Sequence, residues 1–131
     1  KKGEEVGSGA FGCVFKSKFR GEEVAAKQHK ELTPDGIKKS GIADNPDKFQ
    51  EIVKEIENEI AAFLTMGHHG HKNLVRFVAI GIEKINGQPI PVYILSDFIE
   101  GGTLKTWLLD GHGPDEMCRV VIETCEGLHF M

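Results

Sequence analysis

A glycine-rich segment near the N-terminus, Gly7-Ser8-Gly9-Ala10-Phe11-Gly12, constrains the fold most strongly. It fits the pattern G-x-G-x-x-G, in which the glycines let backbone N–H groups approach phosphate oxygens closely. A dinucleotide-binding fold would begin a helix inside this segment. Here the segment continues into Cys13-Val14-Phe15-Lys16, whose alternation predicts a strand. The pattern therefore disfavours a dinucleotide-binding oxidoreductase and predicts a phosphate-binding loop between two strands.

This strand and three further apolar runs predict strands that pair as hairpins. CVFKSKF and EEVAAK are joined at Arg20-Gly21, and Asn86-Gly87 joins the run over residues 73–85 to the run over residues 89–98. Asn-Gly is a strong signal for a two-residue hairpin turn. Residues 31–44 carry proline and glycines without apolar periodicity, so we expect a loop there.

A long helix is predicted to begin at Asn45-Pro46, where an asparagine cap precedes proline at the first helical position. Gly67 is suited to ending it. The apolar residues of its packed face are Phe49, Ile52, Val53, Ile56, Ile60, Phe63 and Leu64. Residues 101–110 predict a short helix, and Pro114 opens another. The apolar stripe of this last helix comprises Met117, Cys118, Val121, Ile122, Cys125 and Leu128.

Composition and charge disfavour several classes of partner. The net charge is −4, without a basic cluster, so we expect neither nucleic acid nor an anionic membrane as a partner. No apolar run is long enough to span a bilayer. Three cysteines without C-x-x-C spacing favour a reducing compartment, by default the cytoplasm. The first residue is Lys1, which favours a soluble fragment of a longer protein.

His68, His69 and His71 raise the possibility of a metal site, because imidazole is a common metal ligand. Adjacent side chains diverge, however, and no cysteine or carboxylate stands at a recognisable ligand spacing. We therefore expect no metal site in this segment.

The string GSGAFGCV, followed by Lys27 within VAAK, resembles the glycine-rich loop and third strand of protein kinases. The resemblance implies that the segment from Gly7 to Gly12 surrounds the phosphates of ATP, with Phe11 capping them. It also implies that Lys27 holds the α- and β-phosphates. The residues that it implies around the adenine are Val6, Val14 and Ala25.

In protein kinases the lysine is oriented by a carboxylate on a movable helix. Four glutamates of the predicted long helix compete for this role, namely Glu51, Glu55, Glu57 and Glu59. Helical geometry places Glu57 and Glu59 on opposite rims of the apolar stripe. The kinase pattern then favours Glu59, because Phe63 and Met66 follow it at four and seven positions. The link GHHGH is longer than usual for the family.

The segment from Tyr93 to Leu104 resembles the fifth strand, the hinge and the entry to the large lobe of a kinase. This implies that Ser96 is the gatekeeper, and that the Asp97 carbonyl and the Ile99 backbone read the adenine edge. Thr103 would lie near the ribose or cap the following helix. Because Ser96 is small, we expect it to admit ligands with bulky groups behind the adenine.

The last segment, RVVIETCEGLHFM, resembles the helix that precedes the kinase catalytic loop. Neither H-R-D nor D-F-G occurs in the 131 residues. The general base and the Mg²⁺ ligands of a full domain are therefore not in this chain. We expect this chain alone to be inactive, although the full domain would use ATP with Mg²⁺.

The resemblance implies an α+β fold, with a five-stranded antiparallel sheet and one long helix in a small lobe over residues 1–99. Residues 100–131 would begin a helical large lobe. The strings RGEEVAAK and EGGTL favour the tyrosine-kinase-like group. The function implied is transfer of the ATP γ-phosphoryl group to Ser, Thr or Tyr of a protein substrate. The alternative is a pseudokinase that binds nucleotide or a partner without phosphotransfer.

Overall fold

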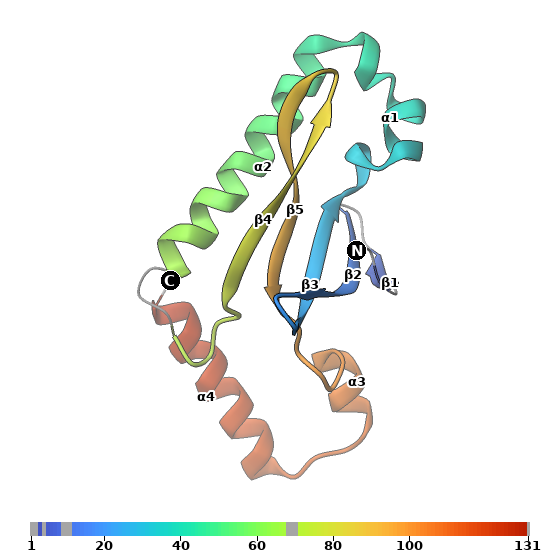
Figure 1. Ribbon diagram of the computed structural model, residues 1–131. Coiled ribbons are helices and arrows are strands. Elements are labelled where there is room, and N and C mark those ends of the chain that lie inside the picture. The colour runs from blue at the N-terminus through green and yellow to red at the C-terminus, as the bar shows by residue number, and fades with distance from the viewer. Residues whose placement is uncertain (1–2, 4, 9–11, 68–70, 131) are drawn as a thin grey trace.

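The computed structural model describes residues 3, 5–8, 12–67 and 71–130. The elements follow one another along the chain as β1 (Glu5–Ser8), β2 (Gly12–Phe19), β3 (Glu22–His29), η1 (Lys30–Leu32), α1 (Pro34–Ser40), η2 (Ile42–Asp44), α2 (Pro46–Gly67), β4 (Phe77–Ile85), β5 (Gln88–Asp97), α3 (Leu104–Leu109) and α4 (Pro114–Phe130). Figure 1 shows α2 running along one side of the twisted sheet. Helix α1 lies near the upper end of the strands, and α3 and α4 lie beyond their lower end. The predicted α+β class is confirmed.

The five strands form one antiparallel sheet in the order β1-β2-β3-β5-β4. Both predicted hairpin turns are present. Arg20 and Gly21 have φ values of 51° and 82°, and Asn86 and Gly87 have 52° and 78°. Left-handed backbone at both turn residues matches the right-handed twist of the flanking strands, which explains the asparagine and glycine at these positions.

Helix α2 begins where the sequence predicts. The Lys48 backbone N–H donates to Asn45 Oδ1 at 3.2 Å, so the asparagine satisfies one of the free amides of the first turn. The helix packs on the sheet through a core made of Leu32, Ile42, Phe49, Ile52, Val53, Ile56, Ile60, Ile90, Val92 and Ile94. Leu64 was predicted on this packed face but is 52% exposed, because the core contacts end near Phe63.

Residues 31–44 were predicted to be a loop, and this is wrong. The segment forms η1, α1 and η2. Thr33 caps α1 by accepting from the Gly36 N–H at 3.0 Å, Pro34 stands at the first helical position, and Gly41 ends the helix in the left-handed region. Buried Leu32 and Ile42 hold the ends of the segment in the core. Helix α1 has no buried residue of its own, so no apolar stripe signalled it.

The strand predicted over residues 73–85 begins only at Phe77. Of the residues before it, Arg76 accepts a backbone hydrogen bond from Asp97 of β5, whereas Asn73 contacts α4. Asn73 Nδ2 donates to the Glu123 carbonyl at 2.8 Å and to Glu126 Oε2 at 3.2 Å. A Cβ atom on Gly127 would lie 3.3 Å from the Asn73 carbonyl oxygen, so the glycine allows this close approach. The link between α2 and β4 is therefore the docking point of α4.

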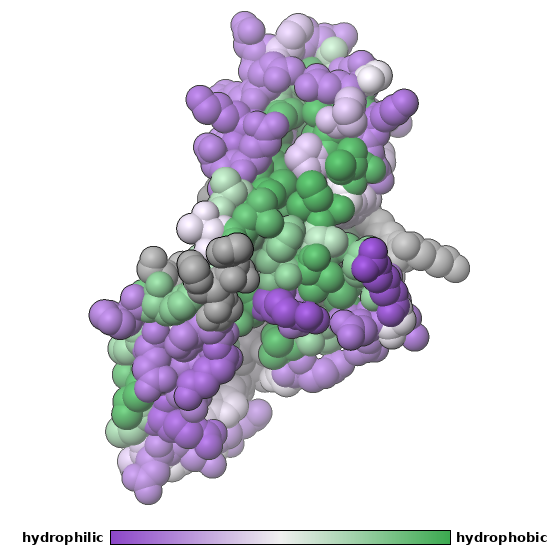
Figure 2. Space-filling model, turned by 60° about the vertical axis from the view of Figure 1, so that its left-hand side comes forward, coloured by the Kyte–Doolittle hydropathy of each residue, from purple (hydrophilic) through white to green (hydrophobic). Residues whose placement is uncertain are grey.

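Both C-terminal helices form as predicted, but their apolar residues remain exposed. On α4, Met117, Val121, Ile122 and Leu128 are 44 to 63% exposed. Large hydrophobic residues are also exposed on the strands, among them Ile80 and Ile82 of β4. Figure 2 shows hydrophobic side chains gathered over the middle of one face, bordered by hydrophilic side chains above and below. Within the described ranges, no helix is long and apolar enough to cross a membrane.

Candidate functional site

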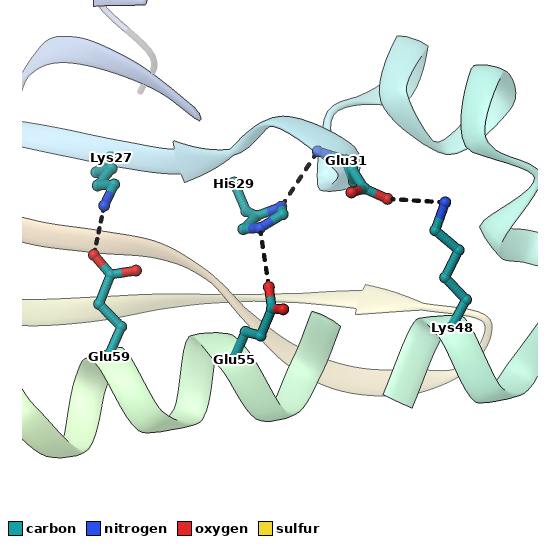
Figure 3. A network of polar contacts seen from close by, with 6 residues as sticks. All are labelled: Lys27, His29, Glu31, Lys48, Glu55 and Glu59. Carbon is teal, nitrogen blue, oxygen red and sulfur yellow. Dashed lines mark hydrogen bonds and ion pairs between the residues drawn. The ribbon is translucent and has the colours of Figure 1, made fainter. Parts of the chain in front are cut away.

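The centre of the candidate site is an ion pair between β3 and α2. Lys27 Nζ lies 2.5 Å from Glu59 Oε1, and Figure 3 shows the two side chains pointing toward one another across the gap between strand and helix. The side chains are 41% and 34% exposed. The lysine amine therefore has a carboxylate partner and still reaches solvent, which leaves donors for a ligand.

Alternation along β3 places Lys27 on the side of the sheet that faces α2. Val24, Ala26 and Gln28 are buried on the other side of the strand, so the intervening residues turn toward the helix. On α2, Glu59 precedes buried Ile60 and lies at the rim of the apolar stripe. The sequence argument that favoured Glu59 over the other glutamates therefore agrees with the observed pairing.

The strand register brings together the small and apolar residues predicted around the adenine. Val14 lies opposite Lys27, and Ala25 lies opposite Ser96. Residues directly opposite each other in neighbouring strands share a face of the sheet. The small side chains of Ala25 and Ser96 thus lie on the same face of the sheet as Lys27.

Part of the glycine-rich segment is described. Gly7 lies opposite Val14 across β1 and β2, and Ser8 lies opposite Cys13. Val6 is 47% exposed, at a register irregularity of β1. A Cβ atom on Gly12 would lie 2.4 Å from the Gln28 carbonyl oxygen, so only glycine fits there. Gly9, Ala10 and Phe11 lie outside the described residues.

Strand β2 begins at Gly12, one residue before the strand that the sequence predicted from Cys13. A dinucleotide-binding fold would have a helix at this point. The observed strand therefore removes the structural basis for the oxidoreductase interpretation.

The predicted hinge leaves β5 at Asp97. The Asp97 N–H donates to the Arg76 carbonyl at 3.0 Å, and its carboxylate pairs with the Arg76 side chain. Ile99 is 62% exposed. Thr103 caps α3, since its Oγ1 accepts from the Thr106 N–H at 3.2 Å. Of the two roles predicted for Thr103, the structure shows the cap.

Three residues near the site, namely Arg76, Lys16 and His29, were not singled out from the sequence. Hydrogen bonding from Arg76 lowers the pKa of Asp97 and raises that of Arg76. Lys16 Nζ donates to Glu100 at 3.1 Å and lies 4.6 Å from the centre of the Phe98 ring, so it links β2 to the hinge. The hydrogen bond to Glu100 is the main cause of a raised pKa of Lys16.

The third residue missed is His29, which lies two residues beyond Lys27 and approaches Glu55 (Figure 3). A signal was available for His29 and Lys16, because they continue the alternation of Lys27 and Val14 along the same strands. Nothing in the sequence pairs Arg76 with Asp97.

The histidine cluster is only partly described, since His68 and His69 lie outside the described residues. His71 Nδ1 accepts from the Asn73 N–H at 3.0 Å, and its ring lies 5.0 Å from that of Phe130. His71 therefore supports the link and the docking of α4. Over the part of the chain that the structure describes, no three His, Cys, Asp or Glu residues are grouped as metal ligands.

A model of the family described as "Protein tyrosine and serine/threonine kinase" matches residues 1–131. The chain belongs to the protein kinase family. The fold agrees with this membership, because a five-stranded antiparallel sheet with one long helix is the architecture of the N-terminal lobe of a kinase.

Similar kinases include three proteins of Dictyostelium discoideum that are named probable serine/threonine-protein kinases. The first is 30% identical over 106 residues, which are 81% of this chain and 11% of that protein. A second, kinX, is 34% identical over 104 residues, 79% of this chain and 8% of its own length. A third is 28% identical over 130 residues, 97% of this chain and 27% of that protein. The kinase chain described here thus spans about a quarter or less of these relatives.

Proposed function

We propose that this chain is the ATP-binding part of a protein kinase, and that the whole protein transfers the γ-phosphoryl group of ATP to serine or threonine of a protein substrate. The observation that carries the proposal is the ion pair between Lys27 and Glu59. The preference for serine and threonine rests on the names of the relatives, which are serine/threonine-protein kinases.

The exposed amine of Lys27 supplies the cation for the α- and β-phosphates. A lysine holds phosphate as a point charge, so its direction must be set by another group. Glu59 provides that group from α2. The glycines at positions 7, 9 and 12 suit this role, because glycine puts no side chain between a backbone N–H and a phosphate.

The residues around Ala25 and Ser96 fit the adenine. Val6 and Val14 cover one face of the base, and Ala25 adds a small apolar contact beside it. The Asp97 carbonyl and the Ile99 backbone read the edge of the base, and Thr103 lies toward the ribose. Ser96 leaves space behind the base.

Mg²⁺ bound with ATP would neutralise charge on the transferred phosphoryl group. The residues present fit the triphosphate and not the metal, because this chain contains neither of the motifs that carry the magnesium ligands in kinases. The contribution of this chain is therefore binding and orientation of the nucleotide.

We divide the chain into a nucleotide-binding lobe over residues 1–99 and the start of a helical lobe over residues 100–131. The division follows the end of β5 at Asp97, after which the remaining elements are the helices α3 and α4.

A pseudokinase would not require Lys27 and Glu59 to meet, so their pairing favours an active enzyme.

The proposal is tested on the whole protein from which this chain derives, with [γ-³²P]ATP and a mixed serine, threonine and tyrosine peptide library. We expect phosphate on serine or threonine, and its loss in Lys27→Met. Lys84→Met, an exposed strand lysine, is the matched control and retains activity. The 131-residue chain alone incorporates none. Activity that persists in Lys27→Met would contradict the proposal, and complete inactivity of the unsubstituted protein would favour the pseudokinase.

A further inference from the structure

The pair between Lys27 and Glu59 is one of three that connect β3 and the following η1 to α2. His29 Nε2 lies 3.9 Å from Glu55 Oε2, and Glu31 Oε2 lies 3.5 Å from Lys48 Nζ. Figure 3 shows the three pairs in a row. From Lys27 to Glu31 the residue numbers increase, while those of the partners on α2 decrease from Glu59 to Lys48. We call these three pairs the ladder.

The spacing of the first two pairs matches the geometry of the two elements. Two residues along a strand advance about 6.6 Å. Four residues along a helix advance about 6 Å. Lys27 and His29 on β3 therefore meet Glu59 and Glu55 on α2 in one common register.

That spacing also creates a wrong register. Glu55 and Glu59 are two carboxylates one helical turn apart, and they repel each other. If α2 shifted by one turn, Glu55 would lie opposite Lys27 in place of Glu59. The apolar stripe opposes this shift only in part, because the positions of Val53, Ile56 and Ile60 would be taken by Phe49, Ile52 and Ile56, which are also apolar.

His29 is held in an orientation that engages Glu55. Its Nδ1 accepts from the Glu31 N–H at 3.3 Å, which leaves the ring hydrogen of the neutral form on Nε2. Nε2 faces Glu55, at a distance that makes the contact electrostatic and too long for a hydrogen bond. The His29 side chain is 16% exposed, whereas that of Glu55 is 64% exposed, so solvent screens this contact from the side of the glutamate.

One cavity of about 180 Å³ between β3, α2 and β5 is lined by both of the first two pairs, that is by Lys27, His29, Glu55 and Glu59.

The third pair, Glu31 with Lys48, adds a constraint at the start of α2. Glu31 Oε2 is buried without a hydrogen-bond partner among the described residues, and Lys48 Nζ lies 3.5 Å from it. The two side chains are 43% and 38% exposed, so this pair adds only a modest preference for the observed register.

We propose that His29 and Glu55 are positioning residues: by occupying Glu55, His29 excludes it from Lys27 and holds α2 where Glu59 orients the nucleotide-binding lysine. The consequence for nucleotide rests on the proposed function. The register of α2 does not, and it can be measured without nucleotide.

The test follows the side-chain carboxyl carbon of Glu59 by ¹³C NMR in the 131-residue chain, with the resonance assigned by Glu59→Gln. In a chain that keeps His29, Lys27→Met shifts this resonance because the ion pair with Glu59 is lost. In a chain that carries His29→Leu, we expect adding Lys27→Met to shift the resonance by less than half as much, because Glu59 is no longer the partner of Lys27. His29→Gln retains an N–H donor and an acceptor at the same reach, so it restores the full shift.

A purely structural role for His29 would lower stability but leave the response of Glu59 to Lys27 intact. An unchanged response in His29→Leu would therefore overturn the inference. If His29→Leu does not fold, His29→Asn, whose shorter side chain does not reach Glu55, replaces it with the same expected loss. Glu55→Gln in either background should restore the response, because the competing carboxylate is gone. Glu51→Gln, at an exposed position of α2, is the control and leaves the response unchanged.

Binding of a fluorescent ATP analogue separates this inference from the proposed function. We expect His29→Leu to weaken it roughly 3- to 10-fold, and Glu59→Gln to add little further loss in that background, as coupled residues do. If the unsubstituted chain bound no nucleotide, the proposed function would fail, while the Glu59 resonance would still decide the role of His29.

Discussion

The guanidinium group of Arg76 holds both carboxylate oxygens of Asp97, with Nε 3.0 Å from Oδ2 and Nη2 2.9 Å from Oδ1. Such two-point pairing fixes direction as well as distance. Arg76 Nη2 also lies 3.4 Å from Glu22 at the start of β3. The end of β5 is thereby tied to the residue before β4 and to the start of β3, at the point where the predicted hinge begins.

This pairing predicts an acid-dependent loss of stability. The hydrogen bond from Arg76 lowers the pKa of Asp97 below its ordinary value of 3.8. The folded state thus favours the carboxylate, and the stabilisation is present above the unfolded pKa and lost as pH falls through the folded one. We expect the stability difference between the unsubstituted chain and Arg76→Met to be constant from about pH 5 to 7 and to shrink below about pH 4.

Urea unfolding across this pH range measures the effect, which is small because a third of the Asp97 side chain is exposed to screening solvent. In Asp97→Asn the titrating group is gone, so Arg76→Met should have no pH-dependent effect in that background. A difference that grows toward low pH would contradict the assignment.

The size of Ser96 predicts which ligands enter behind the adenine. Ser96 lies opposite both Ala25 and Phe77 in the sheet, so a large side chain there would fill the space beside two neighbouring strands. Ser96→Phe should abolish binding of inhibitors with bulky back-pocket groups while sparing an ATP analogue. Calorimetric titration with a matched pair of inhibitors, with and without the bulky group, measures this. If the bulky ligand bound Ser96→Phe as tightly as it bound the unsubstituted chain, Ser96 would not be the gatekeeper.

The cap of α1 predicts a stability cost for a surface substitution. Thr33 Oγ1 accepts from the Gly36 N–H at 3.0 Å, and Thr33→Ala removes this acceptor. We expect a loss of about 1 kcal/mol in the free energy of unfolding. Thr33→Ser keeps the hydroxyl and should stay close to the unsubstituted chain. Chemical denaturation of both variants tests the cap, and equal losses would show that the hydroxyl does not matter.

Gln28 predicts a gain in stability. The residue is 1% exposed, and its Oε1 has no hydrogen-bond partner among the described residues. An unsatisfied buried acceptor costs free energy that an apolar side chain of similar length avoids. Gln28→Met should therefore raise the free energy of unfolding by about 1 kcal/mol. Gln88→Met, at an exposed position of β5, serves as control, and a destabilised Gln28→Met would contradict the assignment.

Most of the sheet could be predicted because its determinants are local. Asn86-Gly87 and Arg20-Gly21 specify turns that match the twist of the strands, and Asn45-Pro46 specifies the start of α2. The segment containing α1 could not be predicted by periodicity, since its helix buries none of its own residues and is held by Leu32 and Ile42 outside it. Its caps, Thr33 and Gly41, were the available signal.

The site divides in the same way. Lys27 was identified from a local string, and Glu59 from helical geometry together with the family pattern. The contacts of Arg76 with Asp97 join residues 21 positions apart, and those of His29 with Glu55 depend on how α2 is set against β3. Such long-range pairs have no local sequence signature, so the supports of the site emerged only with the fold.

The most direct test of the account is the affinity of the 131-residue chain for ATP, measured by calorimetry with Lys27→Met and the control Lys84→Met. A charge-assisted hydrogen bond to phosphate contributes about 1.5 to 3 kcal/mol, so Lys27→Met should weaken binding roughly 10- to 100-fold. Lys84→Met should bind as the unsubstituted chain does. Equal affinity of Lys27→Met and the unsubstituted chain, or the absence of saturable binding, would contradict the account.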